Sequence, residues 1–441
     1  MKARVYTGSR QLSLRTHRLL DRMLAPATGL CQQIGFLMRS PLEARLAVAG
    51  GDMTGVHVLR GLGEPRSGSH HIGGCGPTYD EAIIKTLGET VERYAQQSVI
   101  VDGRVRIQRA SYQQMLAAGH RVLGGPGFDL FTPAQLARPG FPFTAIDART
   151  SIGWVALSSL PDHGECWAPA QVALLGYRRA PDEPRFMLGV STGTAAHTDP
   201  VQALERALLE LIQIDSVMGH WYGRGVAVPL AADERTRAVT AVVQRHIHRD
   251  GPRPRFYWLP NADLPGFTIA CLVEDDVVPK LGVGLGCSLR LDRAIYSAFL
   301  EGMAVAQLAK VILFRQAVGD LPPTPTPEAL YDLDLNVSHY AVLGAAAVRR
   351  KFPDGQPVRT SELPADFGGG TRCLIESFAK TNKALAWLDM TTPDLRSLGF
   401  YVARVWSPET LSLCFPSAPP LRHSRFGAYG AADHESPHPY P

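Results

Sequence analysis

One helical pattern occurs three times in this chain and constrains its fold more than any other feature. Each copy has an alanine, a small and a bulky apolar residue four and five positions later, and a glutamate at the seventh position. The copies are Ala82-Thr86-Leu87-Glu89, Ala203-Ala207-Leu208-Glu210 and Ala294-Ala298-Phe299-Glu301. Each follows a glycine-containing stretch that we expect to be a loop; the stretches are Gly74/Gly76, Ser191-Thr192-Gly193 and Gly284/Gly286. Three helices with a glutamate at an equivalent depth predict that several carboxylates point into one common place.

Convergent carboxylates predict a bound cation, because like charges that meet need a positive charge between them. Hard oxygen ligands suit Mg²⁺, and loop amides at helix N-termini suit phosphate. The joint prediction is a magnesium nucleotide that carboxylates hold through the metal. For one helix taken alone, the alternative is a solvated face that carries a Lys85/Glu89 ion pair.

The first of these helices has a start signal in the sequence. Thr78 is the predicted N-cap, and Glu81 follows three residues later, as in a capping box. On the helical wheel Glu89 and Glu92 lie one turn apart, opposite the apolar face. The second helix is predicted from Asp199, its N-cap, to about Tyr222, and the third continues toward Ala317.

Strands are expected between these helices. The sequence predicts a helix within residues 11–26 and strands at Val56–Leu59, Trp154–Ser158, Phe186–Ser191, Phe256–Leu259, Phe267–Val273 and Gly282–Cys287. The run LPPTPTPE, residues 321–328, is a predicted surface loop too short to separate independent domains. Strands that alternate with long helices, followed by a final run of strands, predict an α/β or α+β fold of one large unit.

Composition excludes several other classes of protein. The net charge of +4 is spread over 441 residues without a basic block, so neither nucleic acid nor membrane is an expected partner. No apolar run approaches the length of a membrane span. Seven scattered cysteines without a C-x-x-C pair predict a cytoplasmic protein that lacks structural disulfides and a zinc site.

The repeated helices also carry a resemblance to a known family. The run GGCGPTYDEAIIKTLGETVERY resembles the first motif of the YcaO superfamily, and STGTAAHTDPVQALERALLELIQIDS resembles the second. The run GVGLGCSLRLDRAIYSAFLEGMAVAQ is similar to the third motif, more loosely, and Gly399 to Arg404 resembles part of the C-terminal segment. The resemblance implies a single YcaO-type domain in which long helices pack on mixed sheets around a nucleotide site. Its expected parts are an N-terminal helix and strands (1–65), the nucleotide-binding core (66–320), a C-terminal part (321–420) and a tail (421–441).

The resemblance also implies site residues, with ATP and Mg²⁺ as cofactors. The residues expected to face the metal are Glu89, Glu92, Glu210 and Gln213. The residues expected to bind the nucleotide are Gly74, Gly76, Arg93, Ser191, Thr198 and Gln202. For Glu301, direct ligation of the metal and a charge on the helix face near the site are both left open.

Some positions depart from the family pattern. Cys75 stands where a lysine is usual, and Gln213 and Ile214 replace a glutamate and an arginine. An amide oxygen still coordinates Mg²⁺, but more weakly than a carboxylate. Cys75 has no assigned base, and a lone cysteine of this kind is more typical of a small loop residue than of a nucleophile.

The chain ends in Ser436-Pro-His-Pro-Tyr-Pro441. Composition alone predicts a disordered polyproline-II end. Azoline-forming members of the YcaO family characteristically end in PxPxP, and by that resemblance Pro441 would place its α-carboxylate in the active site as a general base or positioning group.

The implied activity is ATP-dependent cyclodehydration of Cys, Ser or Thr in a ribosomally made precursor peptide, as in microcin-type thiazole/oxazole synthases. Expected partners are the precursor peptide, a leader-binding E1-like recognition subunit and an FMN-dependent azoline dehydrogenase. Two alternatives remain open. One is a non-catalytic scaffold that binds nucleotide or none, and the other is a backbone thioamide-forming enzyme, against which the PxPxP end argues.

Overall fold

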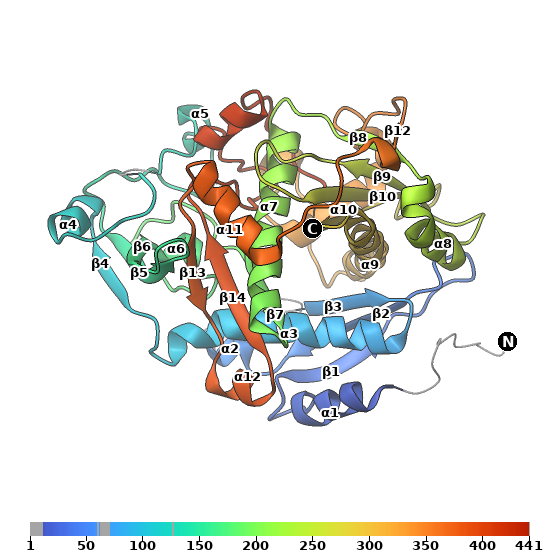
Figure 1. Cartoon of the computed structure of the whole chain (residues 1–441), viewed down its shortest axis with the longest axis horizontal. Helices are drawn as coiled ribbons and strands as arrows, with labels where there is room; N and C mark the ends of the chain where they lie inside the picture. Colours follow the sequence, from blue (N-terminus) through green and yellow to red (C-terminus); the bar gives the residue numbers. More distant parts are fainter. Residues whose placement is uncertain (1–11, 60, 62–70, 126–127, 441) are drawn as a thin grey trace.

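The computed structural model describes residues 12–59, 61, 71–125 and 128–440, and within them the strands form three sheets (Figure 1). The first sheet has the order β1-β2-β3, formed by Cys31–Phe36, Ala47–Met53 and His71–Gly76. The second has the order β4-β5-β13-β14-β7, with β6 beside β5. Its strands are Ile107–Ala110 (β4), Ile152–Ser159 (β5), Glu165–Pro169 (β6), Thr194–His197 (β7), Ala386–Asp389 (β13) and Tyr401–Trp406 (β14).

The third sheet has the order β11-β10-β9-β8-β12. Its strands are Val228–Ala231 (β8), Arg253–Trp258 (β9), Phe267–Glu274 (β10), Leu281–Ser288 (β11) and Val358–Arg359 (β12). The short β12 runs parallel to β8, whereas β8, β9, β10 and β11 pair antiparallel. This arrangement confirms the predicted mixed sheets packed by long helices.

Three long helices each follow one strand of a different sheet. They are α3 (Tyr79–Val101) after β3, α7 (Pro200–Tyr222) after β7 and α9 (Leu291–Ala317) after β11. Each helix packs on its own strand and also contacts a strand of another unit, α3 on β7, α7 on β11 and α9 on β3. The three strand–helix units therefore close into a ring. In Figure 1, α3 crosses below α7, and α9 is seen almost end-on.

The start signals of α3 and α7 work as the sequence predicts. Thr78 accepts the N–H of Glu81 at 3.2 Å, and Asp199 accepts the N–H of Gln202 at 2.9 Å. The capping box at Thr78 is only half formed. The Glu81 carboxylate instead accepts from Tyr296 at 3.0 Å and pairs with Lys85 at 2.9 Å.

The glycine-rich stretch before α3 is a strand, which corrects the expected loop. A Cβ at Gly74 would lie 2.2 Å from the carbonyl oxygen of Ala82 and 2.7 Å from the nitrogen of Thr86. Gly286 of β11 stands in the same relation to Ala294 and Ala298, at 2.3 and 2.6 Å. The glycines and the small residues of the repeated pattern therefore let strand and helix backbones approach closely. Of the three stretches that precede the repeated pattern, only the one before α7 contains the expected loop, in which Gly193 has φ of 83°.

Two predicted strands are wrong. Val56–Leu59 forms the short helix α2, because Gly55, with φ of 67°, turns the chain and its carbonyl accepts from the N–H groups of Val58 and Leu59. Residues 186–191 belong to no described strand. The N–H of Phe186 there bonds the side chain of Gln171 instead of a neighbouring strand.

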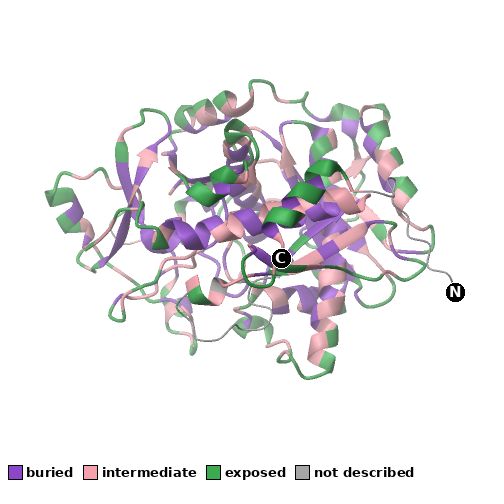
Figure 2. Ribbon diagram, turned by 90° about the horizontal axis from the view of Figure 1, so that it is seen from below, coloured by how far each residue is buried: buried purple, intermediate pink, exposed green. Residues whose placement is uncertain are grey.

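The remaining helices lie around this frame, and Figure 2 shows exposed residues along several of them and buried residues along the central elements. They are α1 (Leu14–Met23), α4 (Tyr112–Ala117), α5 (Pro133–Leu136), α6 (Ala170–Ala173), α8 (Arg237–His246), α10 (Leu333–Leu343), α11 (Gly370–Lys380) and α12 (Pro393–Ser397). All seven cysteines are free thiols.

Helix α9 corrects the expectation about apolar runs. Its 27 residues, with a mean hydropathy of 1.5 in the most apolar window, are long and apolar enough to cross a membrane, and half of that window is buried inside the protein. It packs against β11 and β10, as a core helix does.

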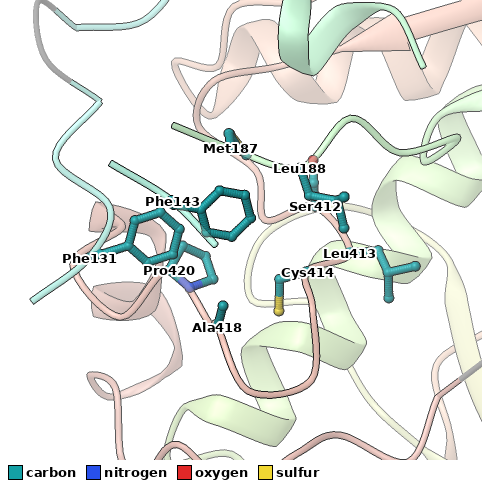
Figure 3. A pocket seen from close by; sticks show the side chains of 9 residues that line it. All are labelled: Phe131, Phe143, Met187, Leu188, Ser412, Leu413, Cys414, Ala418 and Pro420. Carbon is teal, nitrogen blue, oxygen red and sulfur yellow. The ribbon is translucent and has the colours of Figure 1, made fainter. Parts of the chain in front are cut away.

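A small apolar cavity lies where three segments of the chain meet (Figure 3). Phe131 and Phe143 form one wall, Met187 and Leu188 a second, and residues between 412 and 420 the third. The lining includes none of the predicted site residues.

Candidate functional site

The three repeated glutamates have equivalent surroundings. Glu89 accepts the backbone N–H of Gly73 at 2.7 Å, and the backbones of Gly193 and Leu285 hydrogen-bond Glu210 and Glu301 in the same way. In each unit the helix carboxylate is therefore bound to the segment that precedes the helix, which is a strand at Gly73 and Leu285 and a loop at Gly193. This contact fixes the three carboxylates at one depth of the ring.

The carboxylates are also close enough to influence one another. Burial raises the pKa of Glu92 well above its usual value, and the neighbouring Glu210 and Glu89 raise it further. Burial likewise raises the pKa of Glu301 to about 8, with a further contribution from Glu89. The pKa of Glu210 is raised by burial and by Glu301, although Arg404 and Arg93 oppose the shift. Glu89, Glu92, Glu210 and Glu301 thus act on one another electrostatically and form one acidic group.

Two arginines face this acidic group. Arg93 pairs with Glu89 at 3.5 Å and also acts electrostatically on Glu92 and Glu210. Arg404 on β14 is 3% exposed, and it donates to the carbonyl oxygens of Thr192 and Val172 and to the hydroxyl of Thr194. Burial lowers the pKa of Arg404 to about 10, and the attraction of Glu210 and Glu92 counteracts the shift.

Sequence reasoning did not assign Arg404 to the site. The sequence does contain a signal that could have identified it, a single arginine within the apolar strand run Tyr-Val-Ala-Arg-Val-Trp. A charge buried in a strand requires a partner, so such an arginine indicates a nearby carboxylate.

Two further arginines lie on the same helix faces as Glu210 and Glu301. Arg206 lies one turn before Glu210 on α7, and Arg293 lies two turns before Glu301 on α9. Both side chains are exposed, and partial desolvation together with the nearby Arg293 lowers the pKa of Arg206. Two cations that repel each other at this position attract an anion, and a triphosphate has that charge.

Lys85 places another positive charge at the neighbouring strand. Its ammonium donates to the carbonyl of Cys75 at 3.0 Å and pairs with Glu81, so the alternative interpretation, a Lys85/Glu89 pair, is wrong. Burial raises the pKa of the Cys75 thiol to about 12. Cys75 is therefore an inert strand residue, and Lys85 brings an amino group to the position where the resemblance expects a lysine.

The other predicted nucleotide residues surround the start of α7. Thr198 accepts from Arg15 of α1 at 3.1 Å, Gln202 occupies the first turn, and Ser191 precedes the loop that binds Glu210. Gln213 lies one turn beyond Glu210, on the same side of α7. Gly74 and Gly76 serve strand–helix packing, as described above.

The donor set suits Mg²⁺ that is shared with a nucleotide. In the described part of the chain no three His, Cys, Asp or Glu side chains form a ready metal cage. Mg²⁺ commonly uses one or two carboxylates, with water and substrate phosphates as its other ligands, and Glu92 and Glu210 supply such a pair. Buried polar atoms without a protein partner also lie on these elements, Nε of Arg404 and both amide atoms of Gln96, one turn beyond Glu92.

The C-terminal tail is an ordered part of the fold up to Tyr440, which corrects the disordered alternative. His438 and Tyr440 are fully buried, and Asn336 donates to the carbonyls of both, at 2.6 and 3.2 Å. Trp221, at the end of α7, donates to the carbonyl of Ser436 at 2.9 Å. Pro441, the predicted source of the active-site carboxylate, lies outside the described residues.

Comparison with known proteins agrees with this arrangement. A family model described as YcaO cyclodehydratase, ATP- and Mg²⁺-binding, matches residues 73–411. A search of curated protein sequences found no match.

Solved structures share the fold at low identity. A heterocyclase in complex with substrate and cofactor aligns with a TM-score of 0.71 and 18% identity, over 100% of this chain and 59% of its own. The YcaO protein of Methanopyrus kandleri bound with AMPPCP and Mg²⁺ gives 0.55 and 16%, over 92% and 91%. The E. coli microcin synthetase McbBCD complex gives 0.57 and 10%, over 92% and 96%. This chain thus spans well under two thirds of the heterocyclase. Because the family model covers more than half of its residues, the chain belongs to the YcaO family, whose members bind ATP and Mg²⁺.

Proposed function

We propose that this chain is the ATP-dependent cyclodehydratase subunit of a peptide-modifying complex, which forms thiazoline or oxazoline rings from Cys, Ser or Thr of a precursor peptide. The observation that carries the proposal is the meeting of Glu92 and Glu210 with Arg93 and Arg404 inside the ring of strand–helix units. Family membership supports an ATP-using enzyme, and the heterocyclase fold supports ring formation.

The reaction needs activation of a poor leaving group. The side chain of Cys, Ser or Thr attacks the preceding peptide carbonyl, which gives a tetrahedral oxyanion. Transfer of the γ-phosphoryl group of ATP to that oxygen releases ADP. Phosphate then leaves as the amide nitrogen loses its proton and the C=N bond forms. The overall result is an azoline ring, ADP and phosphate, with the oxygen of the lost water carried by the phosphate.

The chain's own residues position charge for this reaction. Glu92 and Glu210 would hold Mg²⁺, with Glu89 and the amide of Gln213 beside them, and Arg93, Arg206 and Arg293 would hold the phosphates. Bound Mg²⁺ supplies a positive charge that offsets the charge on the transferring phosphoryl group. Ser191, Thr198 and Gln202, at the loop and the first turn of α7, would orient the nucleotide, and Arg404 keeps the glutamates compatible with burial.

The proposed partners follow from the same assignment. The microcin synthetase complex covers nearly the same length of chain and has been solved with its pro-peptide bound. We infer that a leader-binding E1-like subunit captures the precursor peptide and that an FMN-dependent dehydrogenase oxidises azolines to azoles. A cytoplasmic location fits the seven free thiols. Co-purification of the three chains tests the assembly, and full cyclisation by this chain alone contradicts it.

The activity test is the ATP-dependent loss of one water mass per ring from a precursor peptide, with partner subunits present. We expect the loss in the wild type and in the control Glu205→Gln, which changes a carboxylate on the same helix away from the acidic group. We expect no loss in Glu210→Gln. Removal of residues 436–441 tests the proposed role of Pro441. We expect this deletion also to abolish the loss of water mass.

Two observations favour a second candidate, a scaffold that binds nucleotide without catalysis. Gln213 and Ile214 replace charged residues of the family pattern, and the described residues hold no ready metal cage. Nucleotide binding without mass loss, in a complete complex with bound precursor, would establish the scaffold. A mass gain of sulfur for oxygen would establish thioamide formation.

A further inference from the structure

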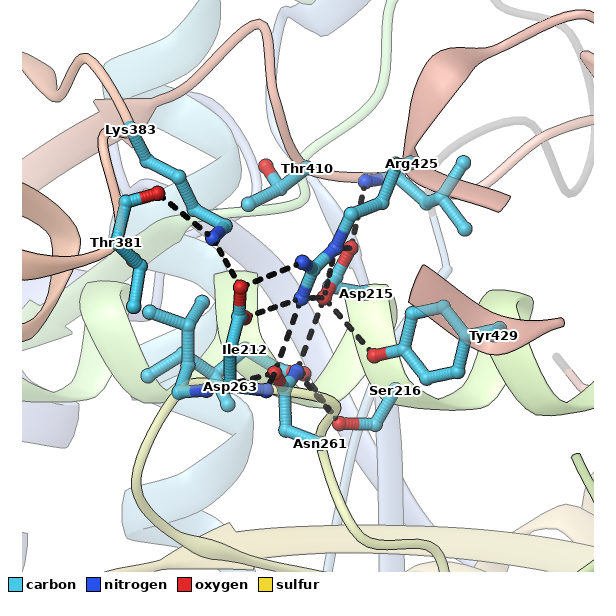
Figure 4. A network of polar contacts seen from close by, with 12 residues as sticks. Ile212, Asp215, Ser216, Asn261, Asp263, Thr381, Lys383, Thr410, Arg425 and Tyr429 are labelled. Carbon is cyan, nitrogen blue, oxygen red and sulfur yellow. Dashed lines mark hydrogen bonds and ion pairs between the residues drawn. The ribbon is translucent and has the colours of Figure 1, made fainter. Parts of the chain in front are cut away.

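A buried arginine joins the C-terminal segment to helix α7, away from the glutamates described above. Arg425 lies in the short 3-10 helix η5 (Ser424–Tyr429) and is 6% exposed. Its Nε and Nη2 donate to Asp215 of α7, at 3.0 and 2.6 Å. Its Nη1 and Nη2 donate to Asp263, at 3.0 and 2.8 Å. Figure 4 shows the guanidinium enclosed by these two carboxylates.

Asp215 is the centre of this cluster and is fully buried. Besides Arg425 it accepts from the hydroxyl of Tyr429 at 3.0 Å, the amide of Asn261 at 2.9 Å and the backbone N–H of Leu411 at 2.9 Å. Two of these donors, Arg425 and Tyr429, belong to η5. The cluster therefore binds η5 to α7 by charge-assisted hydrogen bonds in a dry environment, where such bonds are strong and geometrically exacting.

The chain beyond η5 follows the end of α7. The N–H of Asp433 donates to the carbonyl of Tyr222 at 2.7 Å, and the ring of His434 bonds the carbonyl of Trp221 at 2.7 Å. Asn336 then holds the backbone at His438 and Tyr440. One helix thus carries Glu210 in the acidic group, Asp215 under η5 and Trp221 against the tail.

We propose that Arg425 is a positioning residue, which clamps the C-terminal segment 424–440 onto α7 so that the end of the chain keeps a fixed position relative to Glu210. The inference rests on the proposed function for its effect on ring formation, whereas the clamp itself is a property of the fold. Without the guanidinium, Asp215 and Asp263 lose their shared partner, and η5 loses its main attachment. The tail then keeps its other contacts, among them those with Trp221, Tyr222 and Asn336, and opens more often, while the acidic group on the ring of helices stays assembled.

The test compares Arg425→Met with a matched control, Arg235→Met, in the full chain with its partner subunits. Arg235 is also part-buried and multiply bonded, to the carbonyls of Thr360 and Leu363 and to Asp366, but it lies away from the tail. Arg425→Lys keeps the positive charge but not the planar guanidinium that donates to two carboxylates at once. Tyr429→Phe removes only the hydroxyl that donates to Asp215. These two milder variants keep the test valid if Arg425→Met fails to fold.

The first readout is hydrogen–deuterium exchange of peptides that cover residues 424–441, which needs no activity. We expect at least about tenfold faster exchange in Arg425→Met, an intermediate increase in Arg425→Lys and Tyr429→Phe, and no change in the control, because exchange reports local opening. Unchanged exchange in the tail of a folded Arg425 variant overturns the clamp.

The second readout is kinetic. We expect the Arg425 variants to bind a non-hydrolysable ATP analogue as the wild type does and to lose kcat for ring formation, with partial recovery in Arg425→Lys. Equal losses in the control would mark a general loss of stability and overturn the positioning role. If the wild type forms no ring in a complete complex, the proposed function fails, and the exchange experiment still decides whether the clamp exists.

Discussion

The backbone N–H of Gly73 lies 2.7 Å from Oε2 of Glu89, so the first repeated glutamate is bound by the strand that precedes its own helix. Equivalent contacts from Gly193 and Leu285 bind Glu210 and Glu301. The repeated glutamate thus has two separable functions, closure of a strand–helix unit and supply of negative charge to the centre of the ring. Substitutions that keep the hydrogen bond and remove the charge distinguish them.

Glu89→Gln keeps an acceptor for Gly73 and loses the pair with Arg93, which is part-exposed and long at 3.5 Å. Part-exposed pairs of this kind contribute at most about 1 kcal/mol, so we expect a small change in the free energy of unfolding. We expect a clear loss of Mg²⁺-dependent ATP binding, measured by calorimetry. Normal binding in the variant would limit Glu89 to the structural function.

Gly74→Ala tests whether the glycines serve packing or phosphate binding. A Cβ at Gly74 would overlap the backbone of α3 at 2.2 Å, whereas one at Gly73 would meet nothing closer than 3.6 Å. Overpacking typically costs about 1–3 kcal/mol, and we expect at least that loss of unfolding free energy for Gly74→Ala and little for the control Gly73→Ala. Chemical denaturation measures both. A stable Gly74→Ala protein that no longer binds nucleotide would restore the phosphate-loop interpretation.

The sequence alone was sufficient for the three long helices, because all three carry the repeated pattern and two of them, α3 and α7, also have local start signals. Thr78 and Asp199 cap their helices as predicted, and the ends at Tyr222 and Ala317 match. The glycine stretch before α3 was assigned wrongly, because glycine in a sequence indicates either a turn or a close backbone approach. Which of the two applies depends on α3 packing against β3, which is tertiary information.

The site was partly predictable for the same reason. Glu89, Glu92 and Glu210 were recognisable because the pattern repeats at a helical period. Arg404 comes from a distant strand, and its position beside Glu210 depends on the pairing of β14 with β7. The Lys85/Glu89 pair failed because Glu81 lies at the same spacing on the other side of Lys85, and the carbonyl of Cys75 favours that direction. The contact between Arg425 and Asp215 could not be predicted either, because it depends on where the C-terminal tail packs in the folded chain.

Glu301→Gln should change the pH dependence of stability. Burial raises the pKa of Glu301 to about 8 in the folded chain, whereas an unfolded glutamate titrates near about 4.3. The folded state therefore holds the extra proton between these values. The stabilisation is complete below the unfolded pKa and is lost as pH rises through the folded one, by at most about 1.4 kcal/mol per pH unit.

We therefore expect the melting temperature of the wild type to fall more steeply from pH 5 to pH 9 than that of Glu301→Gln, in which the amide is neutral throughout. Glu92 and Glu210 contribute slopes of the same sign in both proteins. Because Glu301 also raises the pKa of Glu210, the difference between the two curves measures Glu301 together with this coupling. Parallel curves would mean that Glu301 is ionised at neutral pH.

Arg404→Met should be the most damaging single change at the site, because Arg404 is the fully enclosed one of the two arginines that attract Glu92 and Glu210. Removal of one partner from a buried ion pair costs about 3–5 kcal/mol. At pH 8 we expect a smaller loss of unfolding free energy than this, because the two glutamates, whose pKa values are already raised, take up protons instead of staying as unpaired carboxylates. Without Arg404 the raised pKa values of the two glutamates rise further, so at pH 5 both carboxyls are protonated and the loss of unfolding free energy should shrink.

The control is Arg235→Met, which removes an arginine that contacts no glutamate of the ring. It should give a loss of unfolding free energy that is similar at both pH values. Denaturant unfolding of both variants at pH 5 and pH 8 provides the comparison. A loss for Arg404→Met that does not depend on pH would show that Arg404 stabilises the fold through its bonds to Thr192, Thr194 and Val172 rather than by neutralising the glutamates.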